Sequence, residues 1–202
     1  VGLNLDLDHH PRTGLPPEEE FRQFISGYPS IAEQFKDATA AQPWMSSDQL
    51  QFSSQTAVGE RFCMLPHAFG FVDPLFSSGL GVTMFAINAI AVRLIRAASD
   101  GDYSAARFAY VDTWTKKNID FYDRLVSGAY LSFCDFALWN AWHRLWMIGG
   151  MLGPFGQMEV YQRIVNAKDP LDDSLTESFP YRAAQGYELP EFSALFDAAE
   201  KE

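Results

Sequence analysis

The first ten residues of the chain alternate between leucine and polar side chains. Leu3, Leu5 and Leu7 are separated by an asparagine and an aspartate, and the segment ends in two histidines. A period of two is typical of a half-buried strand. Because the segment carries acidic side chains and starts without methionine, it has the pattern of neither a natural start nor a secretory signal. We therefore expect residues 1–10 to form a strand that the sequence enters midway.

Helical spacing replaces the alternation after two consecutive prolines. Pro17 precedes three glutamates, and Phe21, Phe24 and Ile25 follow at positions that share one face of a helix. Proline in the first helical position and an acidic first turn indicate a helix start. We expect one helix here and a second, shorter helix after Pro29.

The middle of the chain returns to strand-like segments before a long apolar run. Leu50 and Phe52 alternate with polar neighbours, and Arg61–Leu65 has the nearly continuous apolar pattern of a strand buried on both faces. Residues from Leu75 to Ala98 are apolar nearly all round, which predicts a buried helix.

The chain beyond the turn at Asp100–Asp102 has the pattern of helices and loops. The expected helices are Ser104–Val126, Leu131–Met147, Gly156–Ala167 and Phe192–Glu200. The sequence thus predicts an α+β protein that is predominantly helical, with a few strands followed by a helical carboxy-terminal region.

Composition narrows the class of protein. With 202 residues, of which 48% are hydrophobic and 15% aromatic, the chain can bury a sizeable core, so disorder is not expected. A net charge of -11 would repel phosphate backbones and anionic lipid headgroups. Nucleic acid and membrane surfaces are therefore poor candidate partners.

The number of cysteines and the length of the apolar stretches indicate the cellular compartment. Cys63 and Cys134 are too few for a disulfide scaffold or a thiolate metal cluster, which fits a reducing environment. Polar residues interrupt the longest apolar stretches, whereas a membrane span needs ~20 nearly uninterrupted apolar residues. We expect a soluble, cytoplasmic protein. The basic pairs Arg93 with Arg96 and Lys116 with Lys117 are expected on solvated faces.

The most informative segment, Leu65–Gly81, joins the predicted buried strand to the predicted buried helix. Asp73 and Pro74 predict a helix cap with proline at the first helical position, and small residues follow at 77, 78, 79 and 81. The unpaired amides and positive dipole of such a helix start attract anions and electron-rich carbonyl oxygens. A flavin's pyrimidine edge and a halide ion both fit. Alternatively, the small residues only let the helix pack tightly against neighbouring backbone.

The run Phe71–Gly79, FVDPLFSSG, resembles the third FAD-contacting motif of the flavin-dependent halogenases and their oxidoreductase relatives. The resemblance implies that Asp73 and Pro74 shape the loop beside the flavin, and that the amides of Ser78 and Gly79 face its pyrimidine side. In true halogenases these two amides also hold the halide. The cofactor-binding set that the resemblance implies is His67, Asp73, Pro74, Ser77, Ser78, Gly79 and Leu80.

The motif departs from the family pattern at its head. A Gly-Asp pair, whose aspartate contacts the ribityl-phosphate region of the cofactor, appears here as Pro66–His67. Under one hypothesis the His67 imidazole donates to a phosphate oxygen instead. Under the other, His67 is a structural histidine. Relatives that hydroxylate or oxidise their substrates share much of the motif, so it indicates FAD more specifically than halogenation.

The sequence lacks the parts that would hold the rest of the cofactor. No GxGxxG follows a strand, and the catalytic lysine and tryptophan-containing signature of the family's amino-terminal half are absent. The catalytic residues are therefore unknown, and we expect this chain alone to bind FAD weakly or not at all and to be inactive. It is also expected to self-associate through its broken sheet. The implied partners are the missing amino-terminal FAD-binding half, a small-molecule substrate and a flavin reductase.

The resemblance also divides the chain. Residues 1–60 would be partial substrate-domain strands and helices, and residues 61–100 the last strand, motif and helix of an FAD-binding domain. Residues 101–202 would form the helical carboxy-terminal region.

Two other clusters have candidate chemistry. Trp139, Trp142 and Trp146 share one face of a predicted helix, with His143 nearby. Such aromatic stripes are usually core, but they also suit a wall for a flat organic substrate. The second cluster, Asp6–His10, is expected to be a solvated turn, because adjacent histidines on an extended chain point to opposite faces; no metal site is predicted.

The sequence is consistent with two functions. The first is the carboxy-terminal part of a flavin-dependent, halogenase-like oxidoreductase or monooxygenase that acts on a small aromatic compound. The second is a non-enzymatic helical module for binding or dimerisation.

Overall fold

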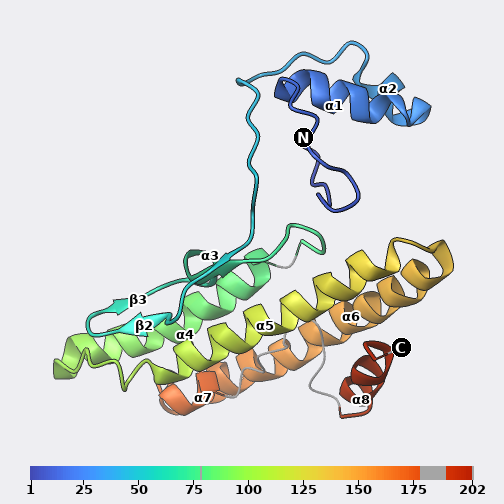
Figure 1. Cartoon of the computed structure of the whole chain (residues 1–202). Helices are drawn as coiled ribbons and strands as arrows, with labels where there is room; N and C mark the ends of the chain where they lie inside the picture. Colours follow the sequence, from blue (N-terminus) through green and yellow to red (C-terminus); the bar gives the residue numbers. More distant parts are fainter. Residues whose placement is uncertain (78, 178–189, 202) are drawn as a thin grey trace. The chain divides into compact units, whose positions relative to one another are not determined.

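The computed structural model describes residues 1–77, 79–177 and 190–201, with the side chains at 149–157, 192 and 193 outside the description. The chain divides by its contacts into two units, Val1–Gln49 and Leu50–Glu202. Figure 1 shows the whole chain with its elements in sequence order.

The smaller unit is built on two short helices, as the sequence predicts. α1 (Pro17–Ser26) begins with proline and an acidic first turn and buries Phe21 and Ile25, and α2 (Pro29–Phe35) follows. The ring of Phe21 lies edge-on to that of Phe35, with their centroids 5.4 Å apart, and also contacts Trp44 at 5.1 Å. This aromatic contact holds the unit together.

The strand predicted for residues 1–10 is wrong. Residues 1–6 have no regular secondary structure, and a turn follows. The Asp6 carbonyl accepts from the amides of His9 and His10, and its carboxylate accepts from the Asp8 amide and the His9 ring. Alternation predicts a strand only where a neighbouring strand completes its backbone hydrogen bonds, and no described strand lies beside these residues.

The strands of the larger unit are short. β1 (Phe52–Ser53) pairs antiparallel with β4 (Gly70–Phe71), and β2 (Val58–Gly59) pairs antiparallel with β3 (Phe62–Cys63). The strand predicted at Arg61–Leu65 is therefore only two residues long. Phe62 is 49% exposed, so the expectation of burial on both faces is also wrong.

Three long helices form the body of the larger unit. They are α4 (Gly79–Asp100), α5 (Ala109–Ser132) and α6 (Phe136–Asn166), and α5 contacts both of the others. Figure 1 shows them lying side by side. The short helices α3 (Pro66–Phe69), α7 (Asp173–Glu177) and α8 (Pro190–Ala199) pack around them. The prediction of a predominantly helical α+β chain is confirmed.

The boundaries of the long helices differ from the predictions, and α5 begins at Ala109 rather than Ser104 and ends at Ser132 rather than Val126. Asp135 caps α6, because its side chain accepts from the amide of Leu138 at 2.9 Å, so Leu131 belongs to α5. The two helices predicted at 131–147 and 156–167 are one continuous helix. A glycine inside a helix costs only about 1 kcal/mol, which contacts along the rest of a long helix can outweigh.

α4 buries one face rather than its whole surface. Val82, Phe85 and Ala86 are buried, whereas Leu80 is 73% and Met84 52% exposed. Among the described helices, α4 alone has the length and composition of a membrane span, with a third of its most apolar stretch inside the protein. A core helix of a soluble protein meets the same criteria, so this feature does not identify a membrane protein.

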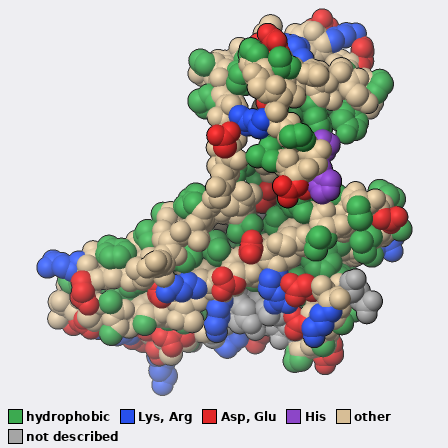
Figure 2. Space-filling view, viewed as in Figure 1, with side chains coloured by type: hydrophobic (Ala, Val, Ile, Leu, Met, Phe, Trp, Pro, Cys, Tyr) green, Lys and Arg blue, Asp and Glu red, His purple; other side chains and the backbone are tan. Residues whose placement is uncertain are grey.

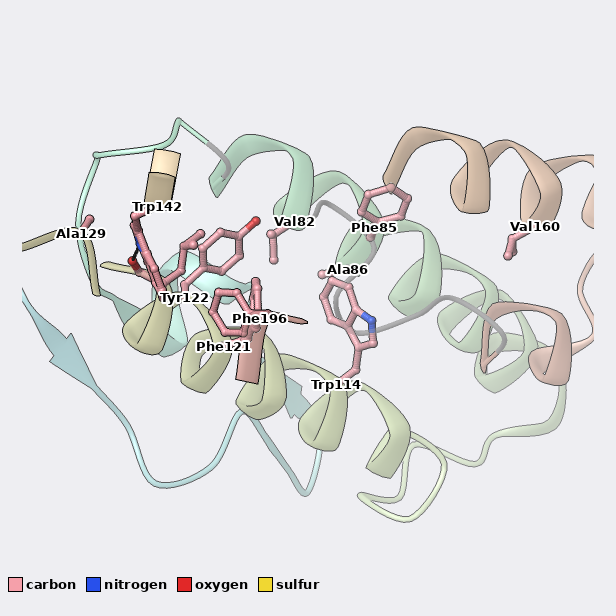
Figure 3. Packing of buried hydrophobic residues seen from close by; sticks show 11 residues of the cluster. Val82, Phe85, Ala86, Trp114, Phe121, Tyr122, Ala129, Trp142, Val160 and Phe196 are labelled. Carbon is pink, nitrogen blue, oxygen red and sulfur yellow. Dashed lines mark hydrogen bonds between the residues drawn. The ribbon is translucent and has the colours of Figure 1, made fainter. Parts of the chain in front are cut away.

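The main core lies where these helices meet. Figure 3 shows the packing of its apolar side chains. The cluster takes residues from four helices: Val82, Phe85 and Ala86 of α4, Trp114, Phe121, Tyr122, Leu125 and Ala129 of α5, Trp142 and Val160 of α6, and Phe196 of α8. Burial of this apolar surface is the main contribution that stabilises the helical body.

Arg93 is a buried cation, so the prediction of a solvated face is wrong for it. Its side chain is fully buried and donates to the Thr176 hydroxyl at 2.7 Å, to Glu177 at 2.9 Å and to the Arg107 carbonyl at 3.2 Å. Arg96 on the same helix bonds the segment before α7 through the Leu171 carbonyl. The two arginines thus attach α4 to α7.

The two lysines of the second basic pair, Lys116 and Lys117, have different surroundings. Lys116 pairs with Asp112 at 2.7 Å on α5, whereas Lys117 is exposed. The expectation of solvated positions is met at Lys117.

Candidate functional site

The motif segment connects β4 to α4. Gly70 allows the close approach of β1, because a Cβ atom on it would lie 3.1 Å from the Phe52 carbonyl oxygen. The chain then crosses from Val72 to Ser77 and enters α4 at Gly79, four residues later than the predicted helix start at Leu75. We call residues 72–77 the motif loop.

Asp73 caps a turn rather than a helix, which corrects the prediction. Its Oδ1 accepts from the amide of Leu75 at 2.7 Å, and the amide of Ser77 donates to the Pro74 carbonyl at 3.1 Å. The other oxygen, Oδ2, accepts from the hydroxyl of Tyr130 at 3.0 Å. The half-buried carboxylate therefore shapes the motif loop locally and joins it to α5.

Two consecutive residues of the motif loop have left-handed backbone conformations. Phe76 has φ of 33° and Ser77 has φ of 50°. Non-glycine residues in this region cost about 1–3 kcal/mol each, and they persist where surrounding contacts fix them. Such strained positions are found preferentially at ligand sites.

His67 and Gly79 come together at the start of α4. A Cβ atom on Gly79 would lie 2.2 Å from Nε2 of His67, so only glycine leaves room for the imidazole as it stands. The exposed ring of His67 also lies edge-on to Phe71, with centroids 5.8 Å apart. Sequence reasoning named both residues as candidates, and the structure places them in contact.

The remaining residues of the predicted cofactor set lie around this contact. Pro74 and Ser77 are exposed on the motif loop, and Leu80 is 73% exposed on the first turn of α4. Ser78, named for the cofactor and for the halide, lies outside the described residues.

The start of α4 has the chemistry to receive an electron-rich edge. The first four amides of a helix have no carbonyl partner within it, and the dipole there is positive. A Cβ on Gly81 would meet nothing within 4 Å, so the backbone is open at that position. One turn after Gly79, the buried Oγ1 of Thr83 has no hydrogen-bond partner. These features fit a flavin's pyrimidine edge or a small anion.

An aromatic cluster on α6 contacts the motif loop. The ring of Phe76 lies 4.9 Å from that of Trp146 and stacks on that of Trp139 at 6.4 Å. His143 lies between the two indoles, with centroids 5.4 and 5.3 Å from them, and Phe133 contacts Trp139 at 4.9 Å. We call Phe76, Phe133, Trp139, His143 and Trp146 the aromatic cluster.

Trp142 does not belong to this cluster. It is 6% exposed, and its Nε1 donates to the Leu125 carbonyl at 3.0 Å. Figure 3 shows it among the core side chains. Trp142 is therefore a core residue, while Trp139 and Trp146 are partly buried, pack against the same core and also contact Phe76 of the motif loop.

Sequence reasoning missed three residues of the site. Phe76 stood inside the quoted motif, and its aromatic ring was the signal that could have singled it out. Tyr130 reaches the motif from α5 through tertiary packing, and Phe133, directly after α5, contacts Tyr130 and Trp139. No local pattern could have found them.

The Cys63 thiol, on β3 before the motif segment, is not activated as a nucleophile. Burial, with a smaller contribution from Asp112, raises the pKa of the Cys63 thiol to about 11, so it stays protonated near neutral pH. In the described part of the chain, no three His, Cys, Asp or Glu side chains come together as a metal site. The groups that the candidate site presents are backbone amide donors, an imidazole and aromatic rings.

No protein-family model matches the chain. It is 41% identical over its full length to the monodechloroaminopyrrolnitrin halogenase PrnC of Pseudomonas fluorescens and covers 36% of that protein. It is 39% identical to the tetracycline 7-halogenase of Kitasatospora aureofaciens over 86% of this chain and 31% of that enzyme. The chain thus spans about a third of the length of these curated relatives.

A halogenase is also found among the solved structures that resemble this chain. The crystal structure of the halogenase PltM in complex with phloroglucinol and FAD superposes with a TM-score of 0.87 at 33% sequence identity. The match covers 96% of this chain and 39% of that protein. The resemblance that the motif suggested therefore extends over nearly the whole chain.

Proposed function

Since this chain is homologous to the carboxy-terminal part of flavin-dependent halogenases, we propose that the complete protein is an FAD-dependent halogenase of small aromatic compounds. One observation carries the proposal beyond homology. The motif loop is held in a left-handed conformation directly before the bare start of α4, with His67 against Gly79. This is the geometry expected of a backbone surface that receives a planar ring edge.

The proposal gives each motif residue a role toward FAD. Asp73 and Pro74 shape the loop, the amides of Ser78 and Gly79 face the pyrimidine edge, and Ser77 and Leu80 border it. In this proposal the His67 ring donates to a phosphate oxygen of the cofactor. FAD, when bound and reduced, would supply the oxidation chemistry with dioxygen as the oxidant.

The halide and the organic substrate are assigned to neighbouring groups. The amides of Ser78 and Gly79 hold the halide, by analogy with true halogenases. The aromatic cluster would contact a flat substrate through Trp139 and Trp146, with His143 between them as the group able to exchange a proton. Phe76 connects this wall to the motif loop, which supports a shared site.

In this proposal, segments of the whole protein that lie outside this chain supply the rest of the cofactor site. The ADP half of FAD requires a segment that this chain does not contain, so the chain alone would bind FAD weakly and be inactive. A flavin reductase supplies the reduced cofactor, and we place the enzyme in the cytoplasm. The alternative of a non-enzymatic helical module is not favoured by the comparisons.

Exposed apolar side chains support an association of this chain with another protein surface. Hydrophobic side chains are visible at the surface in Figure 2. The exposed fraction is 79% for Phe136, 76% for Leu131 and 73% for Leu80. Such surfaces usually find a partner, so we expect the isolated 202-residue chain to self-associate in size-exclusion chromatography. A clean monomer would contradict this expectation.

The central test uses the complete protein. We expect it to be purified with, or reconstituted by, FAD and to show the visible absorbance of bound flavin. With a flavin reductase, chloride or bromide and phloroglucinol or related phenols, mass spectrometry should detect the halogen isotope pattern in the product. A folded protein that takes up no FAD at saturating concentration would overturn the proposal. Oxidised product without halogen would keep FAD and remove the halide assignment.

A further inference from the structure

A hydrogen bond joins the motif loop to the carboxy-terminal end of α5. The hydroxyl of Tyr130 donates to Oδ2 of Asp73 at 3.0 Å, across 57 positions of sequence. Both oxygens of Asp73 are therefore engaged, because Oδ1 already accepts from the amide of Leu75 at 2.7 Å. The ring of Tyr130 is half-buried and contacts Phe133 at 5.3 Å, which fixes its direction.

The motif loop is thus anchored at both ends to the helical body. Asp73 is bonded to Tyr130 of α5 at one end, and Phe76 lies against Trp146 of α6 at the other. The backbone is left-handed at Phe76, the second anchor, and at Ser77 directly after it. A conformation of this kind is not favoured by the residues themselves, so the anchors must maintain it.

We propose that Tyr130 is a positioning residue for the flavin site: it acts through Asp73 to hold the motif loop in the conformation that presents the start of α4. The proposal rests on the proposed function, because it assigns Tyr130 a part in FAD binding. In this proposal the helical region, through Tyr130 of α5, sets the conformation of the motif loop.

Three variants of the complete protein test this role. Tyr130→Phe keeps the ring and its contact with Phe133 and removes only the hydroxyl. Asp73→Ala removes the acceptor, and the double variant removes both. Tyr161→Phe is the matched control, because it removes a hydroxyl that accepts from Asn88 at 2.8 Å and lies on α6, away from the motif loop.

The measurement is the FAD dissociation constant, followed by quenching of flavin fluorescence. We expect Tyr130→Phe to weaken FAD binding about tenfold, equivalent to ~1.4 kcal/mol, and Tyr161→Phe to leave it unchanged. If Tyr130 acts through Asp73, the double variant should bind FAD as Asp73→Ala does, because two changes in one interaction are not additive. Circular dichroism should show the same helix content in all variants.

Each other outcome has a definite meaning. Wild-type affinity in Tyr130→Phe would overturn the proposal. A further tenfold loss when Tyr130→Phe is added to Asp73→Ala would also overturn it, since Tyr130 would then act by a separate structural route. If Tyr130→Phe does not fold, Asp73→Ala with unchanged affinity still overturns it. A wild-type protein that binds no FAD would refute the proposed function instead.

Discussion

The imidazole of His67 occupies the space in which a side chain on Gly79 would begin. The separation between Nε2 of His67 and the position of a Gly79 Cβ would be only 2.2 Å. One residue belongs to the short helix α3 and the other opens α4, so the contact brings the head and the end of the motif together. The Pro66–His67 pair that replaces the family's Gly-Asp pair is therefore part of the same site as the glycine.

We expect Gly79→Ala in the complete protein to displace the exposed His67 ring and to weaken FAD binding about tenfold, equivalent to ~1.4 kcal/mol. Gly81→Ala adds a Cβ that meets no protein atom within 4 Å, so it tests whether an added methyl group at the start of α4, rather than the displaced His67 ring, obstructs the cofactor. His67→Ala separates the causes: if the imidazole itself binds the cofactor, this variant loses affinity as well. Titration with FAD measures all three. An equal loss in Gly81→Ala would show that the effect does not come from the His67 contact.

Sequence patterns predicted the elements whose causes are local. α1 begins where proline and three glutamates favour a helix start, and its buried face follows from the spacing of Phe21 and Ile25. The motif was recognisable because its residues are contiguous. By contrast, the run at residues 1–10 alternates like a strand but forms a turn. Alternation reports which side of a strand faces inward and carries no information about whether a pairing strand exists.

Contacts between residues far apart in the sequence determine features that local patterns did not predict. Arg93 looked like a surface cation, but Thr176 and Glu177, more than eighty positions away, satisfy its donors inside the protein. Tyr130 reaches the motif in the same way. The tryptophans of α6 share a helical stripe, yet Trp142 is buried in the core, whereas Trp139 lies at its edge and also contacts Phe76 of the motif loop. Periodicity gives the face of a helix and not the partner that each position meets.

The two cysteines should differ strongly in reactivity. Burial raises the pKa of Cys63 to about 11, and the Asp112 carboxylate adds to the effect, whereas Cys134 is exposed. Because the thiolate is the reactive form, we expect iodoacetamide near neutral pH to label Cys134 long before Cys63. Peptide mapping by mass spectrometry measures both sites. Cys134→Ser should remove the fast labelling, and rapid labelling of Cys63 in that variant would contradict the assignment.

Asp112 should make stability depend on pH at the junction of α5 with the β2 segment. Burial opposes its ionisation, but hydrogen bonds from Lys116, the Ala57 amide and the Thr56 hydroxyl outweigh burial, so its pKa lies below the ordinary value. A lowered folded-state pKa stabilises the protein above the unfolded value of about 3.9, and the stabilisation is lost as the pH falls through the folded value.

Asp112→Asn should therefore lower the urea midpoint of the chain at neutral pH and reduce its further loss on acidification below about pH 4. Asp120→Asn on the same helix is the control, because Asp120 is exposed. Unfolding followed by circular dichroism at several pH values measures the effect. Identical pH profiles for wild type and Asp112→Asn would show that this carboxylate contributes nothing to acid sensitivity.

The attachment of α8 should depend on a single ring. Phe196 is fully buried, and its ring lies 5.3 Å from both Phe121 and Trp142. Arg124 stacks over it at 5.2 Å while pairing with Asp197 at 2.8 Å, so the charged contact closes over an apolar one.

Truncating a buried phenylalanine to alanine typically costs about 3–5 kcal/mol, whereas an exposed ion pair contributes about 1 kcal/mol or less. Phe196→Ala should therefore release α8 and accelerate amide hydrogen exchange in α8 and in the facing part of α5, as measured by mass spectrometry. Leu195→Ala removes an adjacent side chain that is 50% exposed and should leave exchange nearly unchanged. If Arg124→Ala released α8 as strongly as Phe196→Ala, the charged contacts and not the buried ring would hold this helix in place.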